Sequence, residues 1–219
     1  NENHPGEGLV VAHENISTLV QQEEAMTAAL VGTVEAISDI AEARDPYTAG
    51  HQRSVAKLAR TIAEEMQLSE QQRQTVYLGA SIHDIGKVAI PAEILSRPGR
   101  LSDIEMQLIR THSQTGYDLL KGIPFPWPLG EIVLQHHERL DGSGYPRGLK
   151  GDEIILEARI LAVADTFDAI SSHRPYRPGR GTECAFKELK RLAGTQYDER
   201  IVSVLESPRL QVLVEALYP

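Results

Sequence analysis

The sequence predicts an all-α protein, and three observations support this fold class. Apolar residues recur at steps of three and four along most of the 219 residues, while the alternating pattern of strands is nearly absent. Aromatic residues, which strands favour, make up only 5% of the chain. Glycine and proline gather in short segments such as "KGIPFPWP" and "HRPYRPGRG", where they mark turns. We therefore expect helices joined by short connections.

The first predicted helix covers about residues 9–43, because no proline interrupts this stretch and its apolar residues follow a heptad-like spacing. Glu23 and Thr27 interrupt that spacing. Two interpretations stay open: a signalling helix that forms a homodimer, or an amphipathic helix that lies on its own domain. The apolar positions are Ile16, Val20, Leu30, Val34, Ile37 and Ala41. We expect residues 1–43 to form a linker and this helix, and residues 44–219 to form the main domain.

The helix after "RDPYTAGH" has the strongest pattern in the chain. Val55, Leu58, Ile62 and Met66 follow one another at steps of three and four, which places them on one face. Further helical patterns follow in order at about 70–83, 102–120, 128–138, 152–171, 182–192 and 198–216.

Composition limits the classes of protein. With 41% hydrophobic residues the chain can bury one large core, and a single cysteine, Cys184, excludes an internal disulfide. A formal net charge of -9 argues against broad binding to DNA, which needs clustered cations. No apolar run of membrane-spanning length and no signal-peptide pattern occur, so we expect a cytoplasmic location. Because the sequence begins with Asn1, a piece of a larger sensor protein is also considered.

Several apolar faces lead to polar residues. The face of the helix at 51–66 leads back to His51, and Ile104 and Leu108 lead on to His112. Extended in the same way, the predicted faces reach His51, His83, His112, His136, His137 and Asp165, with Asp84 next to His83. A single inward histidine is more often a core residue bonded to a carbonyl. Five histidines and two aspartates at core-facing positions of five separate helices favour a shared metal centre, since a divalent cation compensates their burial.

The ligand types limit the choice of metal ion. Imidazole and carboxylate without thiolate suit iron, manganese, nickel or zinc, and magnesium is a further candidate. Seven ligands exceed what one tetrahedral ion takes, so we expect two divalent ions with Asp84 as the bridge. Two such ions roughly 3.5 to 4 Å apart would convert a bridging water to hydroxide and favour displacement at phosphorus.

Several motifs resemble one known family. "SIHDIGK" is similar to the HD superfamily of metal-dependent phosphohydrolases, and "HHERLDGSGYP" to its HD-GYP subfamily. "RDPYTAGHQRSVAKLA", "THSQTGYDLL", "ARILAVADTFDAI" and "HRPYR" follow the order of that family, over about residues 44–197. The resemblance implies an HD-domain helical bundle with an inserted GYP loop. It also implies a centre of two or three metal ions, usually iron or manganese, and hydrolysis of cyclic di-GMP.

The resemblance also implies residue roles. His51, His83, Asp84 and Asp165 resemble ligands of one metal, and Asp84, His112, His136 and His137 resemble ligands of the second. Lys87 resembles the lysine that faces the substrate phosphate, so Lys87 and Asp84 are the expected catalytic residues. Tyr145, Arg174 and Arg177 resemble substrate-binding residues, with Arg180 in the same basic loop. The plainer alternatives are a solvated lysine, a structural loop tyrosine and a solvated basic loop.

One position departs from the family pattern. Members with three metals have a glutamate four residues before the first histidine, where this sequence has Tyr47. A phenol is a poor bridging ligand, so we expect two metals and pGpG as the main product, with slow or no conversion to GMP.

Other functions stay open. Hydrolysis of cyclic GMP-AMP would use the same residues. A non-catalytic receptor for the nucleotide, or a di-iron oxygenase on the same scaffold, is also compatible with the ligand set. The resemblance further suggests that the GYP loop contacts GGDEF-type cyclase domains.

Overall fold

The computed structural model describes residues 5–44, 50–97, 99–172 and 179–218, with side chains from residue 16 onward and excluding 42–44. These parts are helical and contain no strand, only two isolated bridges, so the predicted all-α fold is confirmed. The α-helices are α1 (Pro5–Arg44), α2 (His51–Glu65), α3 (Glu70–Ile82), α4 (Ala92–Leu95), α5 (Asp103–Arg110), α6 (His112–Leu120), α7 (Leu129–Gln135), α8 (Leu156–Ser171), α9 (Thr182–Leu192), α10 (Glu199–Val204) and α11 (Pro208–Leu217). Two short 3-10 turns, η1 (Ile85–Ala89) and η2 (Gly151–Glu153), precede α4 and α8.

The core lies among α2, α3, α7 and α8, which pack against one another. Leu58 and Ile62 of α2, Leu78 of α3 and Leu161 of α8 are fully buried there. At Gly79 a Cβ would lie 2.7 Å from the Ile132 side chain, so the glycine permits the close contact of α3 and α7. The strong apolar pattern predicted for the helix after Gly50 therefore corresponds to the central helix of the domain.

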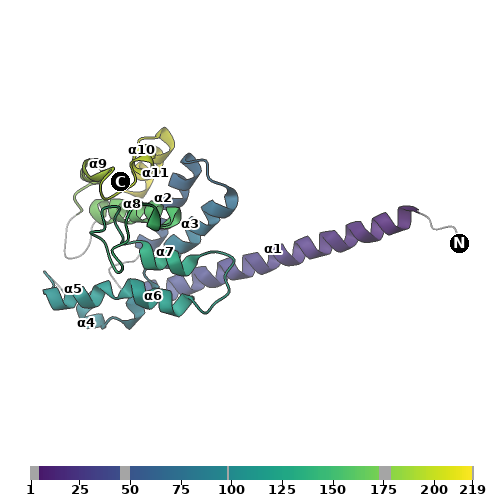
Figure 1. The fold of residues 1–219 in the computed structure, drawn as a ribbon, viewed down its shortest axis with the longest axis horizontal. Coiled ribbons are helices and arrows are strands. Elements are labelled where there is room, and N and C mark those ends of the chain that lie inside the picture. The colour runs from purple at the N-terminus through teal and green to yellow at the C-terminus, as the bar shows by residue number, and fades with distance from the viewer. Residues whose placement is uncertain (1–4, 45–49, 98, 173–178, 219) are drawn as a thin grey trace.

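The two ends of α1 have different surroundings. Its later part packs on α3 and η1, where Val34 is 1% exposed, whereas Ile16 is 59% exposed. Figure 1 shows the earlier part projecting away from the body of the domain. The Ser38 hydroxyl lies 2.6 Å from Oε1 of Gln52 and 2.5 Å from the Ser81 carbonyl oxygen. One part of α1 thus lies on its own domain, and a homodimer through the rest stays a prediction.

The helix predicted at 102–120 is two helices. The N–H and the hydroxyl of Thr111 both donate to the carbonyl of Leu108, which ends α5 in a tight turn before α6 begins. Ile104 is 79% exposed and Leu108 is 38% exposed, so the face that we expected to lead to His112 points to solvent. That prediction was wrong for α5, although His112 itself is buried at the start of α6.

The helix predicted at 198–216 is also divided. Ser207 caps the start of α11 by accepting a hydrogen bond from the Leu210 N–H, and Pro208 occupies the first turn. Proline has no N–H to bond the preceding turn, so it interrupts a helix in its interior but fits in the first turn. The Ser-Pro pair was a visible signal for this boundary. No helix in the described parts of the chain is both long enough and apolar enough to span a bilayer.

Candidate metal centre

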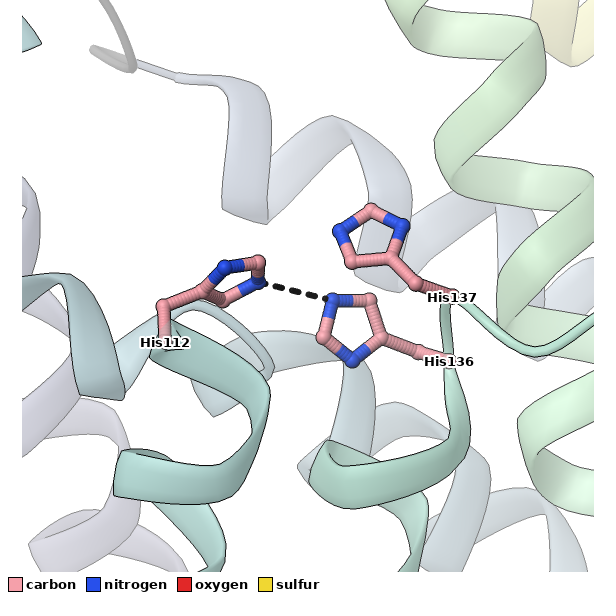
Figure 2. A group of neighbouring side chains, drawn as sticks. All are labelled: His112, His136 and His137. Atoms are coloured by element: carbon pink, nitrogen blue, oxygen red, sulfur yellow. Dashed lines mark hydrogen bonds between the residues drawn. The ribbon is translucent and has the colours of Figure 1, made fainter. Parts of the chain in front are cut away.

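The expected ligands form two neighbouring groups. Ligand atoms of His51, His83 and Asp84 all lie within 4.8 Å of one another, and so do those of His112, His136 and His137. Asp165 adjoins the first group, with its Oδ1 3.3 Å from Nε2 of His51. We call His51, His83, Asp84 and Asp165 the carboxylate half, and His112, His136 and His137 the imidazole half (Figure 2). The structure thus brings all seven expected ligands together.

Helix ends present most of these side chains. His51 and His112 are the first residues of α2 and α6, and His83 and His136 follow the last residues of α3 and α7. Asp165 is the exception, because it lies inside α8. Ends of four helices meeting beside one helix bring residues together that are far apart in the sequence.

Three histidines are oriented by their own backbone. The Nδ1 atoms of His83, His112 and His136 lie 2.7, 2.7 and 2.6 Å from the carbonyl oxygens three residues earlier. A carbonyl oxygen only accepts, so each Nδ1 carries the proton and each Nε2 keeps its lone pair. All three rings therefore direct an unprotonated nitrogen into the centre.

His51 is oriented by a side chain instead. Its Nδ1 lies 2.5 Å from Oδ2 of Asp168, and Oδ1 of Asp168 accepts a hydrogen bond from the Tyr218 hydroxyl at 2.8 Å. Sequence reasoning missed both Asp168 and Tyr218. Asp168 lies three residues after Asp165, on the same side of α8, which was a visible signal.

Asp84 connects the two halves. Its Oδ2 lies 3.4 Å from Nε2 of His83, and its Oδ1 lies 3.4 Å from Nε2 of His112. Nζ of Lys87 lies 2.6 Å from Oδ2 of the same carboxylate. One buried carboxylate therefore faces a ligand nitrogen of each half, as a bridging ligand would.

In the imidazole half, two unprotonated ring nitrogens face each other. Nε2 of His112 lies 3.3 Å from Nε2 of His136 (Figure 2), yet both rings carry their proton on Nδ1. Two facing lone pairs repel unless a cation lies between them and accepts both. A divalent metal ion fits this donor set, which is imidazole and carboxylate with no sulfur.

Charges differ between the halves. Burial, followed by the neighbouring histidines, holds the pKa of His136 well below its ordinary value, and burial lowers that of His137 to about 3. Burial also opposes protonation of His51, but hydrogen bonds and charges from Asp165 and Asp168 raise its pKa to about 9. Burial would raise the pKa of Asp84, yet the Lys87 ammonium group, followed by the neighbouring histidines, holds it well below the usual range. The imidazole half is neutral and the carboxylate half is anionic.

Tyr145 lies over the imidazole half. Its ring centroid is 4.7 Å from that of His137, and the Arg110 guanidinium is 5.2 Å from its ring centroid. At Gly144 a Cβ would lie 2.5 Å from backbone atoms of residues 137–139, so only glycine fits there. The buried carboxylate of Glu138 accepts hydrogen bonds from the N–H groups of Arg147 and Leu149, at 2.7 and 3.0 Å.

Some expected residues lie outside the described part of the chain. They are Tyr47, Arg174 and Arg177. Arg180 is described: its side chain is exposed and its N–H donates to the Ile170 carbonyl at the end of α8. Arg110 and Glu138 are charged residues that contact Tyr145 and its loop, and sequence reasoning did not select them.

Fold and centre together define a class: an all-α protein with a buried histidine and aspartate centre at converging helix ends. The family model described as HD domain matches residues 35–201. The chain therefore belongs to the HD-domain family, and its "HHERLDGSGYP" segment is the HD-GYP form of the sequence.

Relatives agree with this assignment. The chain is 40% identical over 182 residues to the cyclic di-GMP phosphodiesterase response regulator RpfG of Xanthomonas campestris, covering 82% of this chain and 48% of that protein. It is 38% identical over 174 residues to the 3'3'-cGAMP-specific phosphodiesterase 3 of Vibrio cholerae, covering 79% of this chain and 38% of that protein. It thus spans less than half the length of both relatives.

A solved structure has the same fold. Bd1817, an HDG"Y"P protein from Bdellovibrio bacteriovorus, superposes with a TM-score of 0.61 at 21% identity, over 74% of this chain and 51% of that one.

Proposed function

We propose that this chain is a metal-dependent phosphodiesterase that hydrolyses cyclic di-GMP to pGpG. The placement of Asp84 carries the proposal, because its two oxygens each lie 3.4 Å from a ligand nitrogen of a different half. The activities of the relatives support the substrate class, since RpfG is a cyclic di-GMP phosphodiesterase.

Two divalent ions would fit the donor set, and iron and manganese are the first candidates. His51, His83, Asp84 and Asp165 would hold one, and Asp84, His112, His136 and His137 the other. When bound, such ions act as Lewis acids that acidify water and neutralise phosphate charge. A third ion is not expected, because Tyr47 offers no carboxylate.

Lys87 and Tyr145 would act on the substrate. Nζ of Lys87 lies 2.6 Å from Oδ2 of Asp84, so a phosphate bound at the centre would meet its ammonium group as a charged hydrogen-bond donor. Such a donor stabilises the charge that develops on phosphorus oxygens during displacement. Tyr145 packs on His137, with 4.7 Å between the ring centroids, and can pack against a base. Arg174, Arg177 and Arg180 are proposed to bind phosphate or guanine through their planar guanidinium groups.

Purified protein with a measured complement of Mn(II) or Fe(II) tests the proposal. Incubation with cyclic di-GMP should yield pGpG on chromatography, with slow or no GMP. Absence of turnover at full metal content would reject the proposal. Tight nucleotide binding without product would instead support a receptor.

Cyclic GMP-AMP is the second candidate substrate, because the Vibrio cholerae relative is specific for it. Both dinucleotides present a phosphodiester to the same centre. Parallel initial rates on the two substrates separate the candidates, and a higher kcat/KM for cyclic GMP-AMP would replace our first choice.

Partners and location stay predictions. The loop that presents Tyr145 is proposed to contact GGDEF-type cyclase domains, and the projecting part of α1 to form a homodimer. A cytoplasmic location is also expected.

A further inference from the structure

His51 lacks the backbone carbonyl contact that orients three of the other inward rings. His83, His112 and His136 each follow a helical turn, so a carbonyl three residues earlier is within reach. His51 begins α2 directly after Gly50, whose φ of 81° lies in the left-handed region. Because His51 is the first residue of α2, no earlier turn of that helix supplies a carbonyl, and its ring is oriented by a partner from another element.

That partner is Asp168, which is held in turn by Tyr218, the residue directly after α11. Asp168 is 1% exposed, and each of its oxygens has a donor: Nδ1 of His51 at 2.5 Å and the Tyr218 hydroxyl at 2.8 Å. Two donors on opposite oxygens fix the plane of a carboxylate, and this carboxylate fixes the ring of His51. Nε2 of His51 then faces Oδ1 of Asp165 at 3.3 Å.

The packing of α11 fixes Tyr218. Its ring lies 5.7 Å from that of Phe167, between centroids, and α11 contacts α2. An ion pair between Arg209 and Glu64, at 2.5 Å, also joins these helices. Burial and then the Asp168 charge raise the pKa of Tyr218, so its hydroxyl remains a donor.

We propose that Tyr218 is a positioning residue for the metal centre, which acts through Asp168 to orient His51. The inference rests on the proposed function only in requiring that the centre binds a metal. The family model ends at residue 201, before α11, so the contact comes from a part of the chain outside the family match. Outer groups that orient a ligating histidine raise metal affinity by fixing the ring and its tautomer.

The variant Tyr218→Phe tests this proposal, because it removes one hydroxyl and keeps the ring on Phe167. We expect the affinity for one of two Mn(II) ions to fall about 10-fold, the lower end for outer-shell partners, in competition titrations with a chromophoric chelator. Tyr197→Phe is the matched control: its hydroxyl also bonds a side chain of α8, Thr166 at 2.9 Å, but contacts no ligand. Equal affinity losses in both variants would overturn the proposal.

A double-mutant cycle with Asp168→Asn tests the route. If Tyr218 acts through Asp168, Tyr218→Phe should have little further effect on affinity in the Asp168→Asn background. Fully additive losses would contradict the proposal. Melting temperatures measured in chelator distinguish the positioning role from a merely structural one. Without metal, Tyr218→Phe and Tyr197→Phe should lose the same amount of stability.

Failure of this inference and failure of the proposed function are distinguishable. A wild-type chain that binds two ions, beside a Tyr218→Phe variant with unchanged affinity, would reject only the role of Tyr218. A wild-type chain that binds metal without cleaving either dinucleotide would reject the proposed function and leave this test intact. A wild-type chain that binds no ion would reject both.

Discussion

The two halves of the centre stabilise their buried polar groups in different ways. In the imidazole half, His112 and His136 are neutral rings oriented by carbonyls of their own backbone. In the carboxylate half, His51 depends on Asp165 and Asp168, and these acids raise its pKa to about 9. A cation suits both, but for different reasons: it satisfies facing lone pairs in one half and neutralises carboxylates in the other.

The difference shows which contacts are local. Backbone orientation needs only the preceding turn, so the imidazole half is nearly complete once α6 and α7 pack together. In the carboxylate half, the orientation of His51 depends on α8 and on the residue after α11, since His51 and Asp168 are separated by 117 residues and Asp168 and Tyr218 by 50. It should therefore be the more sensitive half to changes far from the centre.

Asp84→Asn should have the largest effect, because it breaks both halves at once. An amide has one oxygen and no charge, so it cannot bridge two cations. Loss of an outer-shell partner costs about 10- to 100-fold in metal affinity or activity, and we expect this change to cost more than about 100-fold in both. Elemental analysis and pGpG formation measure it.

Asp118→Asn is the matched control for this change. Asp118 also pairs with a lysine three residues later, Lys121 at 2.6 Å, but on the surface. Wild-type metal content in Asp84→Asn would contradict the bridge.

Lys87→Met should lower kcat by about 100-fold, the size expected for removing one donor to a developing oxyanion. It acts beside the carboxylate half without removing a ligand, so the metal content should stay at the wild-type value. Lys121→Met controls for loss of a lysine. A fall of metal content in proportion to kcat would show that Lys87 acts only by supporting Asp84.

Gly144→Ala should disturb the imidazole half through its loop. The new Cβ would meet backbone at 2.5 Å, and overpacking of this kind costs about 1 to 3 kcal/mol in the free energy of unfolding. Gly122→Ala is the control, because a Cβ there meets nothing within 4 Å. Chemical denaturation compares the two, and equal stabilities would show that the loop yields without cost.

The metal-free protein should show the smallest effect, in the pH dependence of its stability. The folded pKa of His51, about 9, exceeds its ordinary 6.5, so its stabilising contribution is full below 6.5 and is lost as pH rises toward 9. The folded pKa of His137, about 3, lies below 6.5, so its neutral burial destabilises the fold progressively as pH falls from 6.5 toward 3.

His51→Gln and His137→Gln test these opposite signs. In chelator, His51→Gln should reduce the slope of the free energy of unfolding against pH on the alkaline side, and His137→Gln should reduce it on the acid side. Each slope should change by the equivalent of up to about one bound proton. Unfolding in denaturant at several pH values measures both limbs. Changes of the same sign in the two variants would show that the halves do not differ in charge.

Periodicity predicted the inward residues well wherever the helix lies in the core. The faces of α2, α3, α7 and α8 were confirmed as buried, and they led to His51, His83, His136 and Asp165. In α5 the same reasoning was wrong, since Ile104 and Leu108 face solvent. A repeat of three and four shows that a helix has an apolar face, but it does not show what covers that face.

Breaks in helices were partly visible beforehand. Ser207 and Pro208 indicated the start of α11 in the sequence, because serine is a common N-cap residue and proline fits the first turn. The break at Thr111 has no such signal. Beside it, Gly86 approaches the backbone of α6 so closely that no Cβ fits, a contact that only packing creates.

Local spacing and motifs sufficed to name the family, the helical class and the seven side chains that could bind metal. They sufficed because periodicity fixes the direction of each side chain from its own helix. Packing alone established that Asp84 faces both halves, that Asp168 and Tyr218 orient His51, and that Glu138 holds the loop of Tyr145. These contacts depend on where one helix lies against another, and residues distant in the sequence carry no mutual spacing from which to read it.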